Sequence, residues 1–233
     1  FGYQAGKGGT TSAPFSSGGS NVAMGYQAFD AFTTADANVA VGDAALGALT
    51  SANTNVAVGS QAGASISGTD AIENVIIGGY AGTGGSGDLK RTVAIGKNAL
   101  NSTGTADVIG AVAIGYNALT AANNTNVDYS VAVGHSALGE LQSGQQNVGV
   151  GYQALTATNG GQFNVAMGAE AGKFNVTGTG NIYMGYQAGR GAFGNSHDYN
   201  VGIGYQSLYD VTTSQLTTAI GYRSAYNITS GRY

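Results

Sequence analysis

The sequence predicts an all-β fold, a parallel β-solenoid of about 13 coils, on three observations. A nine-residue phrase typified by "NVAVGSQAG" at Asn55–Gly63 recurs along the chain. Its central glycine returns every 17 to 19 residues after a first gap of 23, which suits one solenoid coil and is too short for a helical repeat or a propeller blade. Before that glycine, β-branched residues alternate with small ones, the period-two pattern of a strand.

Composition narrows the class of protein. The chain has 233 residues, of which 42% are hydrophobic and only 9% charged, with a net charge of −4 and no Cys. It therefore has enough apolar residues for a core, but no disulfide framework and no basic run for nucleic acid. No apolar run approaches the roughly 20 residues of a membrane helix, so we expect no membrane insertion. We expect residues 1–233 to form a single repetitive domain that is a piece of a longer or processed chain.

Three positions of the repeat define its strand. The residue before the glycine is apolar in all 13 copies, and the residue two positions earlier is Val or Ile in 11 of 12. We expect these two positions to line the inside of the coil. The residue between them is Ala in eight of 12 copies and Gly in two. Because Ala is a poor strand former, we expect this column to face outward against another chain. The predicted interface with another chain consists of Ala23, Ala40, Ala57, Ala94, Ala113, Ala132, Gly149, Ala166, Gly202 and Ala219.

The remaining positions predict how each coil closes. Asn opens eight of 12 copies, and we expect stacked Asn side chains to hydrogen-bond as a ladder. The glycine ends the strand at a tight corner, where a Cβ would be excluded. Tyr follows the glycine in seven of 13 copies, and a small residue comes two positions later. A loop of variable length completes the coil.

The repeated phrase resembles the repeat of the YadA-like head of trimeric autotransporter adhesins, and similar repeats of phage tail fibres and surface fibre proteins. "VAIG" stands at Val93–Gly96 and Val112–Gly115, and "VAVG" begins at Val39, Val56 and Val131. The resemblance covers essentially the whole chain. It implies a left-handed parallel β-roll, with three rolls packed about a common axis as a homotrimer. The coil here is longer than that family's usual one, and Tyr-Gln at the corner is a second departure.

No pattern in the sequence indicates catalysis or a cofactor. His135 occupies the Tyr position of its repeat, so we expect a surface corner residue. His197 lies beside Asp198, and one such pair is too little for a zinc site. No nucleophile elbow, phosphate-binding loop or phased pair of carboxylates is present. We therefore expect no enzyme, no catalytic residues, no metal and no cofactor.

Interruptions of a repeat are candidate contact sites. On this basis we place contacts with a partner, a cell-surface glycan or a protein receptor, in the loops around Tyr80, Tyr129, Tyr183 and His197. The corner tyrosines fit two roles, a structural stack, which we favour, or a ladder that binds sugars. Four N-x-Ser/Thr sequons leave glycosylation open, at Asn101, Asn123, Asn175 and Asn227.

Taken together, these features favour the structural and adhesive rod or head of an extracellular trimeric fibre, on a cell or virion surface, that displays loops for attachment. The alternative is a self-assembling extracellular filament or sheath, in which unpaired strand edges stack chain to chain. An ice-binding solenoid ranks below both, because it calls for a Thr ladder where this chain has Ala.

Overall fold

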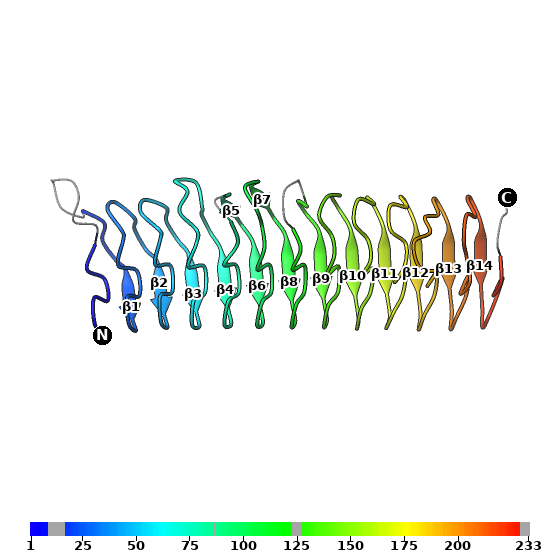
Figure 1. The fold of residues 1–233 in the computed structure, drawn as a ribbon, viewed down its shortest axis with the longest axis horizontal. Coiled ribbons are helices and arrows are strands. Elements are labelled where there is room, and N and C mark those ends of the chain that lie inside the picture. The colour runs from blue at the N-terminus through cyan, green and yellow to red at the C-terminus, as the bar shows by residue number, and fades with distance from the viewer. Residues whose placement is uncertain (9–16, 86, 123–126, 229–233) are drawn as a thin grey trace. The chain divides into compact units, whose positions relative to one another are not determined.

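The computed structural model describes residues 1–8, 17–85, 87–122 and 127–228, and over these residues the chain is an all-β parallel solenoid without α-helix. Two compact units make up the chain. The first comprises residues 1–114 and 122–125, and the second comprises residues 115–121 and 126–233. In each unit, every coil lays one short strand beside that of the coil before it (Figure 1).

The strands of each unit pair in parallel and in the same register. The first unit holds β1 (Val22–Met24), β2 (Val39–Val41), β3 (Val56–Val58), β4 (Val75–Ile77), β6 (Val93–Ile95) and β8 (Val112–Ile114), paired in that order. A separate pair is formed by β5 (Leu89–Lys90) and β7 (Val108–Ile109). The second unit holds β9 (Val131–Val133), β10 (Val148–Val150), β11 (Val165–Met167), β12 (Ile182–Met184), β13 (Val201–Ile203) and β14 (Thr218–Ile220). The described part of the chain makes about 11 turns, close to the predicted 13.

The glycine after each strand forms the predicted corner. Gly151 has a φ of 133°, a region that side chains with a Cβ rarely adopt. A Cβ on Gly151 would lie 2.5 Å from the carbonyl oxygen of Gly168 in the next coil. Glycine is therefore required twice over, by backbone conformation and by the close approach of the neighbouring coil.

A ladder of buried Asn side chains joins the coils, as predicted. In the second unit the Asn164 Oδ1 accepts hydrogen bonds from the Asn181 backbone N–H at 3.0 Å and from its Nδ2 at 2.9 Å. The Asn164 Nδ2 donates to the Gly178 carbonyl at 2.8 Å. Each amide thus hydrogen-bonds both to the start of the next strand and to the loop that precedes that strand. The ladder members are Asn21, Asn38, Asn55, Asn74 and Thr92 in the first unit, and Asn147, Asn164, Asn181, Asn200 and Thr217 in the second.

The small-residue column points inward, so the predicted trimer interface is wrong. Its members are buried inside their own coils, apart from half-buried Ala23 in the first strand: Ala40, Ala57, Ala94, Ala113, Ala132, Gly149, Ala166, Gly202 and Ala219. The cause is the narrow interior beside the corner. A Cβ on Gly149 would already lie 3.2 Å from the Ala154 carbonyl oxygen and 3.2 Å from the Leu138 side chain. The column is small because the corner of the same coil crosses the interior there.

Where the column carries a large residue, neighbouring positions shrink to make room. Ile76 is fully buried, and Cβ atoms on Gly63 and Gly82 would each lie 3.2 Å from its Cδ1. These glycines stand four residues after the corner glycine, where most other coils have a buried Leu or Phe: Phe29, Leu46, Leu100, Leu119, Leu138, Leu155 and Leu208. The interior therefore keeps a nearly constant volume from coil to coil.

The Asn ladder should carry a large share of the stability. We expect Asn164→Ala to lower the free energy of unfolding by about 1–3 kcal/mol or more, because it leaves the Asn181 N–H and the Gly178 carbonyl buried without their partner. Urea denaturation monitored by circular dichroism measures the change. The exposed Asn159 is the control, and Asn159→Ala should stay within about 0.5 kcal/mol of the parent. Equal effects of the two substitutions would contradict the ladder's role.

Candidate functional site

The strands expose an apolar face on the outside of each unit, which we call the outer sheet face. It consists of the first and third residue of each three-residue strand: in the first unit Val22, Met24, Val39, Val41, Val56, Val58, Val75, Ile77, Val93, Ile95, Val112 and Ile114. In the second unit it consists of Val131, Val133, Val148, Val150, Val165, Met167, Ile182, Met184, Val201, Ile203, Thr218 and Ile220. These residues are half-buried or exposed, with Val22 at 46% and Met167 at 41%. A contiguous apolar surface of this kind typically marks an interaction site.

The corner rings stack on one another. In the second unit Tyr205 lies between Tyr186 and Tyr222, with ring centroids 5.2 and 5.4 Å apart and nearly parallel planes. His135 takes the same position between Tyr116 and Tyr152, at 5.1 and 5.4 Å, and is exposed as predicted. Because the ring faces lie against each other, this geometry supports a structural stack over a ladder of free faces for sugars.

Two of the four residues around which contact loops were predicted lie on the surface. Tyr80 is 43% exposed and Tyr129 is 55% exposed, so both are available to a partner. Tyr183 and His197 are fully buried, so these two side chains are not available to a partner. Tyr183 occupies the inward column, where Gly172 and Gly189 leave room for its ring. Contact by the loops that surround these residues stays a prediction.

Tyr183 and His197 instead form a polar pair inside the second unit. The Tyr183 hydroxyl lies 2.6 Å from the His197 Nδ1 and donates to the Asn181 Oδ1 at 3.0 Å. This arrangement assigns the ring proton to Nδ1, with Nε2 left as a bare acceptor; within the described residues Nε2 has no hydrogen-bond partner. Burial lowers the pKa of His197 to about 4 and raises that of Tyr183. Both groups are therefore neutral near pH 7, and the pair braces the fold.

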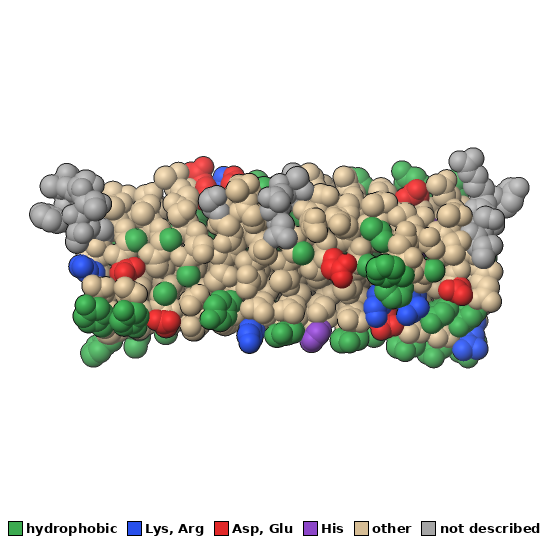
Figure 2. Space-filling view, viewed as in Figure 1, with side chains coloured by type: hydrophobic (Ala, Val, Ile, Leu, Met, Phe, Trp, Pro, Cys, Tyr) green, Lys and Arg blue, Asp and Glu red, His purple; other side chains and the backbone are tan. Residues whose placement is uncertain are grey.

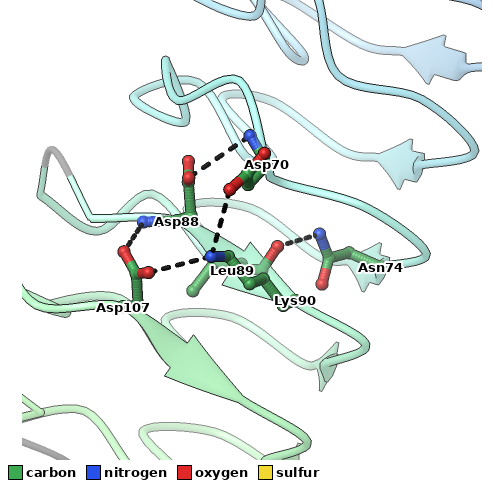
Figure 3. Close-up of polar contacts among 6 residues, drawn as sticks. All are labelled: Asp70, Asn74, Asp88, Leu89, Lys90 and Asp107. Atoms are coloured by element: carbon green, nitrogen blue, oxygen red, sulfur yellow. Dashed lines mark hydrogen bonds and ion pairs between the residues drawn. The ribbon is translucent and has the colours of Figure 1, made fainter.

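Three carboxylates from successive coils gather around Lys90 in the first unit (Figure 3). The Lys90 Nζ lies 3.0 Å from Asp107 and 3.6 Å from Asp70. Asp88 connects them, because its carboxylate accepts from the Asp70 N–H while its own N–H donates to Asp107. This cluster brings together the loops that carry Asp70 and Asp88, two of the interruptions of the repeat.

The electrostatics of this cluster fit a clip between loops. Burial, together with the nearby charge of Asp107, raises the pKa of Asp88. The hydrogen bond from the Asp88 N–H, with the Lys90 ammonium, lowers the pKa of Asp107. The carboxylates of this cluster thus contact backbone N–H groups of the same loops and the Lys90 ammonium. Among the described residues no group of three or more His, Cys, Asp or Glu is arranged to hold a metal ion.

A second charged group lies in the second unit, where Figure 2 shows basic, acidic and hydrophobic side chains gathered over β11 and β12. The Arg190 guanidinium lies over the Phe174 ring at 4.6 Å and the Tyr209 ring at 5.3 Å, and its Nε contacts Glu170 at 3.4 Å. Burial raises the pKa of Glu170, but hydrogen bonds, first from Lys173, outweigh it and leave that pKa below its usual value. The charged side chains of this group pair with one another, so the group connects neighbouring loops.

The sequons differ in their surroundings. Asn175 is buried, and its Oδ1 accepts hydrogen bonds from the backbone N–H groups of Gly178 and His197, so its side chain is closed to a glycan in the folded chain. Asn101 is half-buried and Asn227 is exposed. Asn123 lies outside the described residues.

The buried His197 should make stability depend on pH. In the unfolded chain its pKa returns to about 6.5, while in the folded chain it is about 4. Between these values the unfolded state binds the proton that the folded state excludes. The stabilisation is therefore complete above pH 6.5 and falls as the pH drops to 4, by about 3 kcal/mol in all.

Urea denaturation across this pH window tests the effect. His135 is exposed, so His135→Gln should keep the slope of the parent. His197→Gln should flatten it, at the cost of a lower stability near pH 7. A parent and a His197→Gln variant with the same slope would contradict the assignment.

Comparisons with known proteins found no match to this chain. No protein-family model matches it, and neither a curated protein nor a solved structure does so. In the part of the chain that the structure describes, no helix is long and apolar enough to cross a membrane. Any function must therefore be argued from the geometry of the surfaces described above.

Proposed function

We propose that this chain is a structural and adhesive segment of an extracellular fibre, in which three copies pack through the outer sheet face and display their loops for attachment. The single observation that carries this proposal is the apolar character of that face. It replaces the inward Ala column as the place where the chains meet.

The chemistry of the face supports burial against protein. Both outward positions of the strands carry Val, Ile or Met, with Thr218 as the one hydroxyl and no charge. Parallel sheets are ordinarily covered on both faces, because their strands are apolar on both sides. Here the inner face is covered by the coil itself, and the outer face is half-exposed in the single chain.

The period of the face supports a second copy of the same chain as its cover. Each coil advances by one strand spacing, about 4.8 Å, and presents the same two side chains again. A surface with another period would match such a row at a few positions only. Another copy of this solenoid matches it at every coil, which favours self-association over a chance globular partner.

The number three and the fibre role rest on the resemblance of the repeat to the YadA-like head of trimeric adhesins and to phage-type fibres. In such an assembly each loop is presented three times, so weak contacts add up through avidity. The loops that carry Tyr80 and Tyr129 present exposed rings in this way.

Light scattering after size-exclusion chromatography tests the assembly. We expect a mass three times the 23.1 kDa of the chain. Val150→Asp should shift the mass toward the monomer, because it places a charge in the outer sheet face at a position that is only half-exposed. Asn159→Asp adds the same charge at an exposed loop position and should leave the mass unchanged.

The other outcomes decide against the proposal. A parent chain that is monomeric at all accessible concentrations would refute self-association through this face. Open-ended assemblies of increasing mass would favour the filament alternative. A mass that Val150→Asp leaves at three chains would place the interface elsewhere.

A further inference from the structure

A polar hollow opens on the surface of the second unit, across three successive coils. Its volume is about 340 Å³, within the range of roughly 300–1,000 Å³ that small-molecule sites occupy. Its centre is formed by Ser136 and Gly139, from the coil that begins with β9. Nothing described so far, neither the outer sheet face nor the corner stack, accounts for it.

The hollow exists because the central coil has smaller residues than its two neighbours at two positions. Two residues after the corner glycine, the flanking coils have Asn117 and Gln153, whereas the central coil has Ser136. Five residues after the corner glycine, the flanking coils both have Thr, and the central coil has Gly139. Larger side chains thus stand on either side of a coil that is reduced to a hydroxymethyl group and a hydrogen atom.

The wall of the hollow is rich in hydroxyl, amide and carboxylate groups. Thr120 and Thr156 stand at its two sides, and Glu140 is exposed at its rim. The Thr120 Oγ1 is buried and, among the described residues, has no hydrogen-bond partner. An unmet hydrogen bond of this kind is costly, and a ligand hydroxyl in the hollow would supply the partner after a rotation of the Thr120 side chain.

The corner rings of these three coils lie next to the hollow in sequence but do not line it. Tyr116, His135 and Tyr152 each directly precede a residue that lines the hollow, and all three are exposed. A hollow lined by hydroxyl, amide and carboxylate groups suits a sugar, which offers several hydroxyls as hydrogen-bond donors and acceptors.

We propose that this hollow binds a neutral saccharide. Hydroxyl pairs of the sugar would donate to the Glu140 carboxylate and exchange hydrogen bonds with the threonine hydroxyls and the Gln153 amide. Among the described residues that line the hollow there is no Lys, Arg or His, and the one charged side chain is the acidic Glu140, so an acidic sugar is disfavoured. The proposal deepens the adhesive part of the proposed function and rests on it for biological meaning, but the binding itself needs only one chain.

Saturation-transfer NMR and isothermal titration of the full chain test this inference. The probes are the methyl glycosides of glucose, galactose, mannose and N-acetylglucosamine with their disaccharides, and glucuronic and sialic acids serve as acidic comparators. We expect at least one neutral probe to bind with a dissociation constant in the millimolar range or below, and the acidic probes to bind at least about tenfold more weakly.

Gly139→Thr fills the hollow with the residue that both flanking coils have. Gly139 has an ordinary φ, and a Cβ there would meet the Ser136 carbonyl oxygen at 3.2 Å, so the chain tolerates the side chain with a small adjustment. Binding should weaken at least about tenfold. Gly47→Thr is the matched control, because Gly47 has the same place in its repeat and its Cβ would meet the Ala44 carbonyl oxygen at the same 3.2 Å. It should leave binding unchanged.

Glu140→Gln provides a second variant whose folding is not in question, since the side chain is exposed. It should weaken binding of the neutral probe several-fold. The inference is overturned if no neutral probe binds, if acidic probes bind as well, or if Gly139→Thr binds like the parent. Failure of the fibre proposal shows separately, as a monomeric mass in light scattering with saccharide binding intact.

Discussion

The buried Asn ladder is the interaction on which the rest of the structure depends. Strands of only three residues offer few hydrogen bonds, and most of each coil is loop whose carbonyls need partners away from water. In eight of the 12 coils one Asn amide meets both needs, because it accepts from the next strand and donates to the loop of the next coil, as Asn164 does with Asn181 and Gly178. Where Asn is replaced, Thr92 and Thr217 continue the ladder as donors from the following coil. The fixed spacing between amide and corner glycine then holds every coil in one register.

The second constraint is the width of the interior. The corner crosses so close to the strand that only Ala or Gly fits there, unless a glycine elsewhere in the coil yields the volume, as Gly63 and Gly82 do for Ile76. The β-branched residues on either side of that column therefore face outward. An inward constraint on size thus produces an outward apolar surface, and this is how the packing of a single coil leads to the proposed assembly.

Specific surface chemistry arises where solvent-facing positions of a coil change while its buried residues stay the same. Ser136 and Gly139 change only positions that face solvent, while Ala137 and Leu138 between them keep the core of the coil unchanged. The Lys90 clip and the Arg190 group follow the same rule, since Lys90 in β5 and Arg190 both lie outside the three-residue strand and the corner glycine of their coils. A solenoid of this type accommodates binding sites at loop positions at little cost in stability, because the ladder and the corner do not use them.

The sequence by itself determined the coil period, the short strands, the glycine corner and the Asn ladder, because each follows from local spacing and from the chemistry of one residue type. It did not decide which side of the strand lies inside. A period-two pattern tells which residues share a face of the strand. In a strand of three residues it does not tell which of the two faces is buried, because apolar or small residues stand on both. Only the tertiary structure decided this, through the closeness of Leu138 and Ala154 to the column at Gly149. The contact of Tyr183 with His197 and the hollow at Gly139 were likewise decided by tertiary structure, since both depend on which side chains successive coils bring together.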